Sequence, residues 1–263
     1  MYNLIAIIAA VFYVFSTAII ILGLVYQVGV RSNVTLISAL LALVLHGFLV
    51  ANLIWIDDGQ NLSILNVALL VSFIISLVMS IAMLKIRLWF LLPFVYSFSV
   101  INLSLVMFLP STFITHLENN PKILVHISLA LFSYSTLTVG ALYALQLNWL
   151  DYQLKAKKVL VINPNLPPLM MVERQLFKII SIGTILLTGT LLTGFIFVQD
   201  IFAQSKVHKG ILSFIAWFIY SILLLGHYYK GWRGKKVAWC SVAGSIVLTL
   251  AYFGSRFILE IIL

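Results

Sequence analysis

Long apolar stretches separated by short polar segments dominate the chain. Eight of these stretches are long enough to cross the hydrocarbon core of a bilayer as a helix, which takes about 20 residues. The alternation of apolar and polar residues that is typical of membrane β-strands is not seen. Because lipid cannot satisfy backbone polar groups, the pattern predicts an all-α, polytopic membrane bundle. The predicted spans are residues 4–28, 34–55, 62–84, 88–109, 123–149, 176–198, 210–229 and 237–255.

The polar segments predict the orientation of this bundle. Twelve of the sixteen lysines and arginines lie in or beside the loops that follow spans one, three, five and seven. Because cytoplasmic loops carry an excess of basic residues, both termini are predicted to lie outside. The one long loop, residues 150–175, contains the run N-P-N-L-P-P, which cannot be helical and is interpreted as a connector. No internal repeat is visible, so residues 1–263 are predicted to form a single membrane domain, with Pro93 bending span four.

Composition supports the membrane interpretation and excludes several classes of protein. Hydrophobic residues make up 63% of the chain and charged residues 9%, against roughly 25% charged residues in a soluble domain. A soluble globular enzyme, a disordered chain and a nucleic-acid binder are therefore excluded. The net charge of +9 is explained by the basic loops. With Cys240 as its single cysteine, the chain forms no intrachain disulfide.

Histidine is the side chain with candidate chemistry inside the membrane. Asp, Glu and Lys are absent from the middle of every predicted span, whereas His46, His126 and His227 lie in spans two, five and seven. A neutral imidazole can be buried at modest cost, and it is a common ligand of haem iron. Tyr220 shares a helical stripe with His227, and Trp217 lies off that stripe. Either a haem pocket or a hydrogen-bonded packing seam fits these residues.

Other catalytic or metal-binding patterns are absent from the sequence. The histidines are not clustered with cysteines or carboxylates at the spacing that zinc requires. No aspartate lies at membrane depth near a histidine for hydrolysis of the Ser-His-Asp type. The P-loop, G-x-G-x-x-G and H-E-x-x-H motifs are also missing, so no catalytic residue is predicted.

Three segments resemble the cytochrome c assembly family of haem-handling membrane proteins. The first is G-Q-N-L-S-I-L-N-V, at residues 59–67, and the second is H-I-S-L-A-L-F-S-Y, at residues 126–134. The third, at residues 211–254, is similar to the family's W-x-x-Y-x-x-Y-L-H helix, its G-W-x-G-K-K turn and its closing Y-F-G. Together they cover about a third of the chain, in the order that the family shows.

This resemblance implies a bacterial inner-membrane protein that binds b-type haem without a covalent bond. It assigns His126 as an axial ligand of an outer haem and His227 as a ligand of a haem within the membrane. His46 matches none of these motifs. It is assigned to haem by burial and residue type, with His227 as its favoured partner, and Tyr220 and Trp217 are assigned to the walls of the haem pocket. The implied partners are haem, the lipid bilayer, and cytochrome c maturation components or other membrane proteins.

The chain departs from the synthases of this family in two places. The tryptophan-rich outer motif is replaced by F-A-Q-S-K-V-H-K, at residues 202–209, and no histidine follows His227. Haem handling or transfer is therefore expected, rather than covalent attachment of haem by this chain alone. Two alternatives stay open. One is an accessory membrane subunit that packs through Gly183, Gly189 and Gly194, and the other is a transporter of haem or a precursor, which the lack of repeats disfavours.

Overall fold

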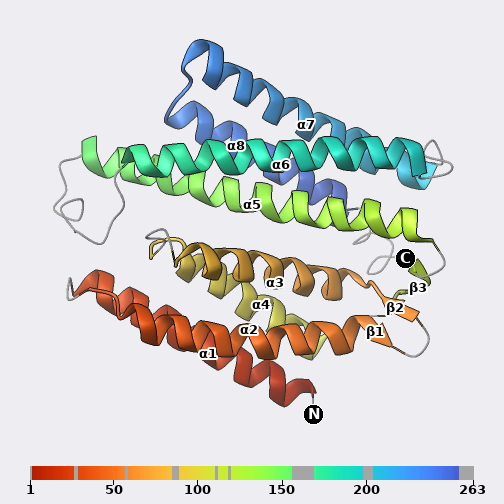
Figure 1. Ribbon diagram of the computed structural model, residues 1–263, viewed down its shortest axis with the longest axis horizontal. Coiled ribbons are helices and arrows are strands. Elements are labelled where there is room, and N and C mark those ends of the chain that lie inside the picture. Colours follow the sequence, from red (N-terminus) through yellow and green to blue (C-terminus); the bar gives the residue numbers. More distant parts are fainter. Residues whose placement is uncertain are drawn as a thin grey trace. The chain divides into compact units, whose positions relative to one another are not determined.

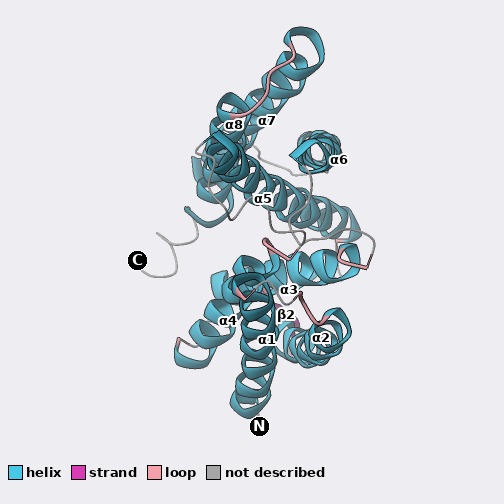
Figure 2. Ribbon diagram, turned by 90° about the vertical axis from the view of Figure 1, so that its left-hand side faces the viewer, coloured by secondary structure: helices cyan, strands magenta, loops and turns pink. Residues whose placement is uncertain are grey.

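The computed structural model describes residues 2–26, 29–56, 59–84, 89–109, 112–117, 120–155, 169–197 and 204–254. Eight α-helices and three short strands form from these residues, and helix dominates every view (Figures 1 and 2). The N-P-N-L-P-P run of the predicted long loop lies outside the described residues. The chain divides into two compact units, α1 to α4 with the strands and α5 to α8, and each is described by itself.

Length and composition confirm a polytopic helical membrane protein. Within the described residues, seven helices are long and apolar enough to cross a membrane. The remaining helix, α4, is also apolar but has only 17 residues. The predicted outward position of both termini stays a prediction.

The first unit packs four helices around a core that contains many hydroxyl groups. α1 (Tyr2–Val25) contacts α2 (Ser32–Ile54) and α4 (Leu92–Phe108), and α3 (Ile64–Ala82) contacts α2 and α4. Two pairs of buried serines join neighbouring helices through hydrogen bonds between their hydroxyls. Ser16 lies 2.6 Å from Ser38, and Ser76 lies 2.7 Å from Ser99. Small polar side chains allow close helix contact in lipid, where burial of apolar groups gives no driving force between helices.

Pro93 does not bend a span as the sequence predicted. α4 begins at Leu92, so Pro93 is the second residue of the helix. N–H groups of the first turn have no partner within a helix, and proline therefore costs nothing at this position. The expectation of a kink in span four is wrong, because the helix starts later than residue 88.

A three-stranded antiparallel sheet joins two loops at one end of the first unit. β2 (Gly59–Asn61) pairs with β1 (Trp55–Ile56) on one side and with β3 (Ile114–Thr115) on the other. The Asn61 side chain accepts hydrogen bonds from the backbone N–H groups of Ser63 and Phe113, at 3.3 and 2.9 Å. The first family-like segment, residues 59–67, thus builds a folded connection between α2 and α3. Sequence analysis did not predict these strands.

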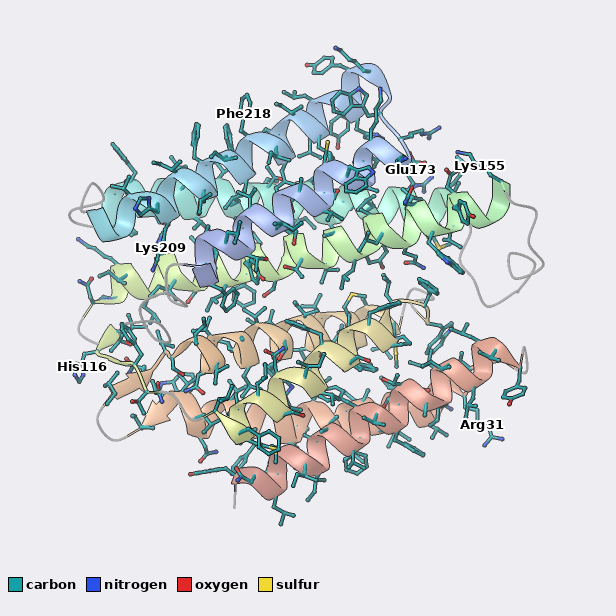
Figure 3. All side chains as sticks on the ribbon, turned by 180° about the vertical axis from the view of Figure 1, so that it is seen from behind. Arg31, His116, Lys155, Glu173, Lys209 and Phe218 are labelled. Atoms are coloured by element: carbon teal, nitrogen blue, oxygen red, sulfur yellow. The ribbon has the colours of Figure 1, made fainter. Side chains whose placement is uncertain are left out.

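The second unit consists of four helices and a π-helical segment. α6 (Leu169–Phe197) contacts α5 (Pro121–Lys155) and α7 (Gln204–Lys230). α8 (Lys235–Thr249) contacts α5 and α7 and continues into the π-helix Leu250–Gly254. Both α5 and α6 extend beyond their predicted spans into the predicted long loop. Lys155 and Glu173 lie at one end of this unit and Lys209 at the other (Figure 3).

The glycines of α6 bring it close to α5. A Cβ atom on Gly183 would lie 2.6 Å from Leu137 Cδ2, and one on Gly194 would lie 3.0 Å from His126 Cε1. Gly189 is less tightly enclosed, since its nearest neighbour is Leu129 at 3.8 Å. The small-residue seam that could have served an external partner is therefore used largely inside the chain.

The second and third family-like segments meet in this unit. Tyr134 of α5 stacks on Tyr252 of the π-helix with a centroid distance of 5.2 Å, and the Phe253 ring meets it edge-on. The Tyr134 hydroxyl also lies 3.1 Å from the Thr249 hydroxyl. The family-like motif that begins at His126 and the closing Y-F-G motif thus pack against each other.

Candidate functional site

His227 stands at the end of α7, where the chain turns sharply into α8. Gly231 has a φ of +62° and ends the helix, and its N–H donates to the carbonyl of His227 at 3.0 Å. Trp232 then folds back along α7. Its N–H donates to the Gly226 carbonyl at 3.1 Å, and its indole occupies the space where a Cβ on Gly226 would be. This turn places the carbonyl oxygen of Trp232 beside the His227 ring.

The contact with Trp232 defines which nitrogen of His227 carries the proton. Nδ1 lies 3.1 Å from the Trp232 carbonyl oxygen. A carbonyl oxygen can only accept, so Nδ1–H is the donor and a neutral ring keeps its lone pair on Nε2. Within the described residues, no group forms a hydrogen bond with Nε2. The ring also stacks face to face on Phe177, at a centroid distance of 3.3 Å and an angle of 13°.

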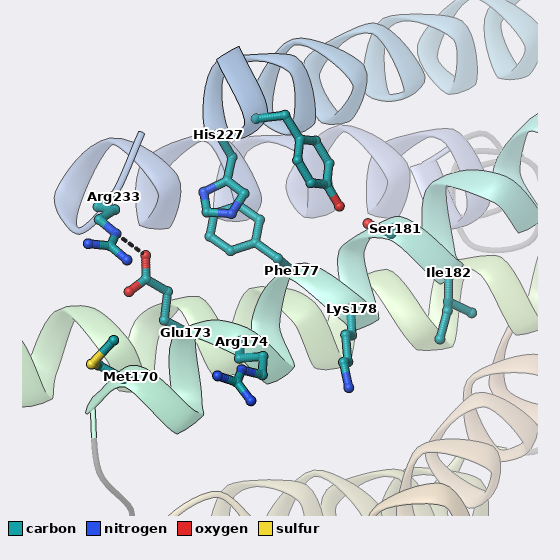
Figure 4. Close-up of a pocket in the computed structure, with 10 residues that line it drawn as sticks. Met170, Glu173, Arg174, Phe177, Lys178, Ser181, Ile182, His227 and Arg233 are labelled. Atoms are coloured by element: carbon teal, nitrogen blue, oxygen red, sulfur yellow. Dashed lines mark hydrogen bonds and ion pairs between the residues drawn. The ribbon is translucent and has the colours of Figure 1, made fainter. Parts of the chain in front are cut away.

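A pocket of about 560 Å³ opens between α6 and α7 beside this ring (Figure 4). Its volume lies within the range of roughly 300 to 1,000 Å³ that is typical of small-molecule and cofactor sites. The wall combines aromatic, basic and aliphatic groups. The lining residues are Met170, Glu173, Arg174, Phe177, Lys178, Ser181, Ile182, His227, Tyr228 and Arg233.

An ion pair fastens the α7–α8 turn to α6. Arg233 Nε donates to Glu173 Oε1 at 2.7 Å, and only 11% of the Glu173 side chain is exposed (Figure 4). Arg233 directly follows Trp232, whose carbonyl holds His227. The ion pair therefore restrains the same turn that orients the imidazole.

Tyr220 and Trp217, assigned to the pocket wall from sequence, lie elsewhere on α7. Tyr220 is fully buried, and its hydroxyl donates to the Ser241 carbonyl of α8 at 3.1 Å. Trp217 Nε1 donates to Thr188 Oγ1 of α6 at 2.9 Å. Neither residue is among those that line the pocket beside His227.

His126 of α5 and His227 of α7 contact opposite ends of α6. Nδ1 of His126 is 3.1 Å from Thr193 Oγ1, while His227 stacks on Phe177. These two α6 residues are about 24 Å apart along the helix, at 1.5 Å per residue. A single iron cannot bind both histidines. Because Thr193 donates its hydroxyl to the Gly189 carbonyl at 2.8 Å, it accepts from Nδ1–H, and Nε2 of His126 keeps a lone pair.

His46 belongs to the first unit and is enclosed there. The side chain is fully buried, Nδ1 lies 3.2 Å from the Tyr13 hydroxyl, and the ring meets Phe73 edge-on at 5.4 Å. Nε2 has no hydrogen-bond partner among the described residues. These surroundings are those of a packed core residue. A shared haem between His46 and His227 stays a prediction.

Sequence reasoning located His227 but missed the groups that surround it. Glu173 and Phe177 lie on another helix, α6, Arg233 lies in the turn that follows α7, and Trp232 acts through its backbone. The one available signal was the G-W-x-G-K-K turn, whose glycines indicate a sharp turn directly after the histidine.

Comparison with known proteins identifies the family. The profile described as "Cytochrome C assembly protein" matches residues 32–263. The chain belongs to the cytochrome c assembly protein family. It is 51% identical to the inner membrane protein YpjD of Escherichia coli (strain K12) over 259 residues, which cover 98% of each chain. No solved structure matches the chain.

Similarity to proteins named for cytochrome c biogenesis is more distant. The cytochrome c biogenesis protein CcsA of Oryza sativa subsp. indica is 24% identical over 180 residues, which cover 55% of this chain and 56% of that protein. CcsA of Synechococcus sp. (strain RCC307) is 28% identical over 80 residues, which cover 30% of this chain and 26% of that protein. Family membership supports a membrane role related to cytochrome c biogenesis, in a multi-pass inner-membrane protein.

Proposed function

We propose that this chain binds b-type haem in the inner membrane and handles or transfers it during cytochrome c maturation. In this proposal, Nε2 of His227 would bind the iron, and the residues of the pocket between α6 and α7 would hold the macrocycle. The observation that carries the proposal is the hydrogen bond from Nδ1–H of His227 to the Trp232 carbonyl. It leaves the lone pair on Nε2, the nitrogen that has no hydrogen-bond partner among the described residues.

The residues of the pocket fit this group. Histidines that bind metals generally donate their other ring N–H to a carbonyl or carboxylate, which fixes the tautomer and the orientation of the ring. Phe177 packs on one face of the imidazole and limits its rotation. Haem bound there would supply an iron that accepts a nitrogen lone pair. The protein would contribute the oriented imidazole of His227, an apolar wall and nearby basic groups.

A reconstitution experiment tests the proposal directly. The protein is purified in mild detergent, titrated with haem, and followed by its Soret band. Wild-type protein should bind haem, and His227→Ala should lower the affinity by roughly tenfold or more because the iron loses its axial ligand.

His208→Ala is the matched control for this experiment. His208 is exposed near the start of the same helix, and the pocket does not include it. This variant should bind haem as the wild type does. A wild-type protein that takes up no haem would contradict the proposal.

The same spectra test the other assigned histidines. His126→Ala should remove a second Soret contribution if His126 binds an outer haem as the family resemblance implies. His46→Ala should change the coordination of the His227-bound iron only if His46 is its second ligand. Identical spectra in wild type and both variants would show that neither His46 nor His126 is a ligand of the iron.

An accessory-subunit role makes a different prediction. Affinity capture from native membranes would then recover a stoichiometric membrane partner, and the three histidine variants would recover the same amount of it. This alternative was based on the small-residue seam of α6. Gly183 contacts Leu137 and Gly194 contacts His126, so this seam is largely occupied within the chain.

A further inference from the structure

Two basic side chains line the α6–α7 pocket, and neither has a carboxylate partner in the part of the chain that the structure describes. Arg174 and Lys178 stand one helical turn apart on α6 and are both exposed. Figure 4 shows both side chains leaving α6 in the same direction, opposite to that of the Glu173 carboxylate and the Phe177 ring. Among the described residues, Glu173 is paired with Arg233, and neither Arg174 nor Lys178 forms an ion pair.

The other groups that line the pocket differ in net charge from these two cations. Glu173 is neutralised by Arg233, Phe177 and Ile182 give an apolar wall, and His227 supplies a lone pair. A ligand that satisfies all of these groups is flat, largely apolar, and negatively charged at one edge. Cations at a helix end near the membrane surface can extend their charged groups toward such an edge.

We propose that Arg174 and Lys178 form a carboxylate-binding edge of this pocket, which recognises the two propionate groups of a tetrapyrrole. The inference rests on the proposed function for the identity of the ligand. It adds that recognition depends on the two acidic side chains of the ring as well as on the metal. The site should therefore bind a dicarboxylate porphyrin that contains no iron.

Metal-free protoporphyrin IX and its dimethyl ester separate this edge from the iron ligand. Both rings lack a metal, so His227 cannot ligate them, and they differ in the charge of the two carboxyl groups. Binding of each is measured by fluorescence titration of the purified full-length protein in detergent. Wild-type protein should prefer the diacid over the ester by roughly tenfold.

Single and double variants then assign the preference to the two residues. Arg174→Gln and Lys178→Gln should each weaken binding of the diacid by about threefold to fivefold, and the double variant by roughly tenfold. Binding of the ester should change by less than about twofold in all three. Arg174→Lys and Lys178→Arg keep the charge and should retain most of the diacid affinity. Lys235→Gln removes an exposed charge outside the pocket and should leave both affinities unchanged.

The possible outcomes separate the two proposals. Equal loss of diacid and ester, or no loss of either, overturns the carboxylate edge. Loss of diacid binding alone supports it, even if the haem spectrum of His227→Ala matches that of wild type, in which case the iron-ligand proposal fails by itself. Haem binding that depends on His227 but not on Arg174 or Lys178 overturns only the carboxylate edge. Size-exclusion profiles that match wild type confirm that each variant is folded.

Discussion

His46 and His227 are the same side chain in two apolar helices, but their surroundings are opposite. His46 is fully buried, pairs with the Tyr13 hydroxyl and meets the Phe73 ring. His227 is half-buried, pairs with a backbone carbonyl and borders an open pocket. The first histidine is enclosed by side chains of its own unit, and the second lines a pocket that a ligand can enter.

This difference shows that a histidine in a membrane span can be either a packed core residue or a residue that lines a pocket. A buried imidazole must be hydrogen-bonded to offset the cost of removing it from water. The Tyr13 hydroxyl meets that need at Nδ1 of His46, whereas Nε2 has no hydrogen-bond partner among the described residues. At His227 the hydrogen bond also orients the ring and fixes its tautomer. Three experiments can contradict or sharpen this contrast, beginning with the largest expected effect.

Replacement of His46 should mainly affect stability. His46→Ala removes a partner of Tyr13 and leaves a cavity beside Phe73, which should cost about 2–4 kcal/mol. The melting temperature, followed by circular dichroism in detergent, should fall by roughly 5–10 °C. His227→Ala should lower it less, because its ring is only half-buried. A His46→Ala protein that melts like wild type but loses haem would reverse the assignments of the two histidines.

Gly226 should be the most sensitive glycine of α7. Gly226→Ala places a methyl group against the Trp232 indole, which must then shift the turn and the carbonyl that holds His227. Haem affinity should drop roughly tenfold.

Gly210→Ala is the matched control for Gly226→Ala. It lies in the same helix, and among the described residues no atom outside that helix turn lies within 4 Å of the added Cβ. Alanine there should stabilise the helix by about 0.5–1 kcal/mol and leave haem binding unchanged. Equal behaviour of the two variants would show that the turn does not orient the imidazole.

The charge that fastens the turn should affect stability less than His46 does. The Glu173 carboxylate is largely buried. Glu173→Gln weakens its ion pair with Arg233 and should lower the free energy of unfolding by about 1–2 kcal/mol. Asp151→Asn weakens the more exposed Asp151–Lys155 pair, which spans one helical turn, and should cost less than about 0.5 kcal/mol. Melting temperatures of the two variants give the comparison. A larger loss in Asp151→Asn would argue against a restraining role for Glu173.

The helices could be predicted from the sequence because lipid-facing segments must be apolar over their whole length. Their ends were less certain. α5 continues beyond its apolar region to Lys155, and α6 begins before its apolar region, at Leu169. Polar and apolar residues are mixed in these extensions, which still form helix. Pro93 was misplaced for the same reason, since the apolar run begins before the helix does. Strands of two or three residues, such as Trp55–Ile56, have no measurable period and could not be predicted from hydropathy.

The candidate site was predictable only in part, because most of its geometry depends on contacts between distant residues. Residue type and family resemblance pointed to His227. The pairing of Glu173 with Arg233 depends on how α6 packs beside the α7–α8 turn, and no local pattern encodes it. Tyr220 shares a helical stripe with His227, but it packs against α8, because Gly244 leaves space for its ring there.

The acceptor for the His227 proton is a main-chain oxygen, so it is present whatever side chain stands at position 232. Substitution can disturb it only by changing the path of the backbone. That path depends on Gly231 and Gly234, which both have a φ of +62°, a conformation that costs other residues about 1–2 kcal/mol. Control over which ring nitrogen is free thus rests on two residues that have no side chain at all.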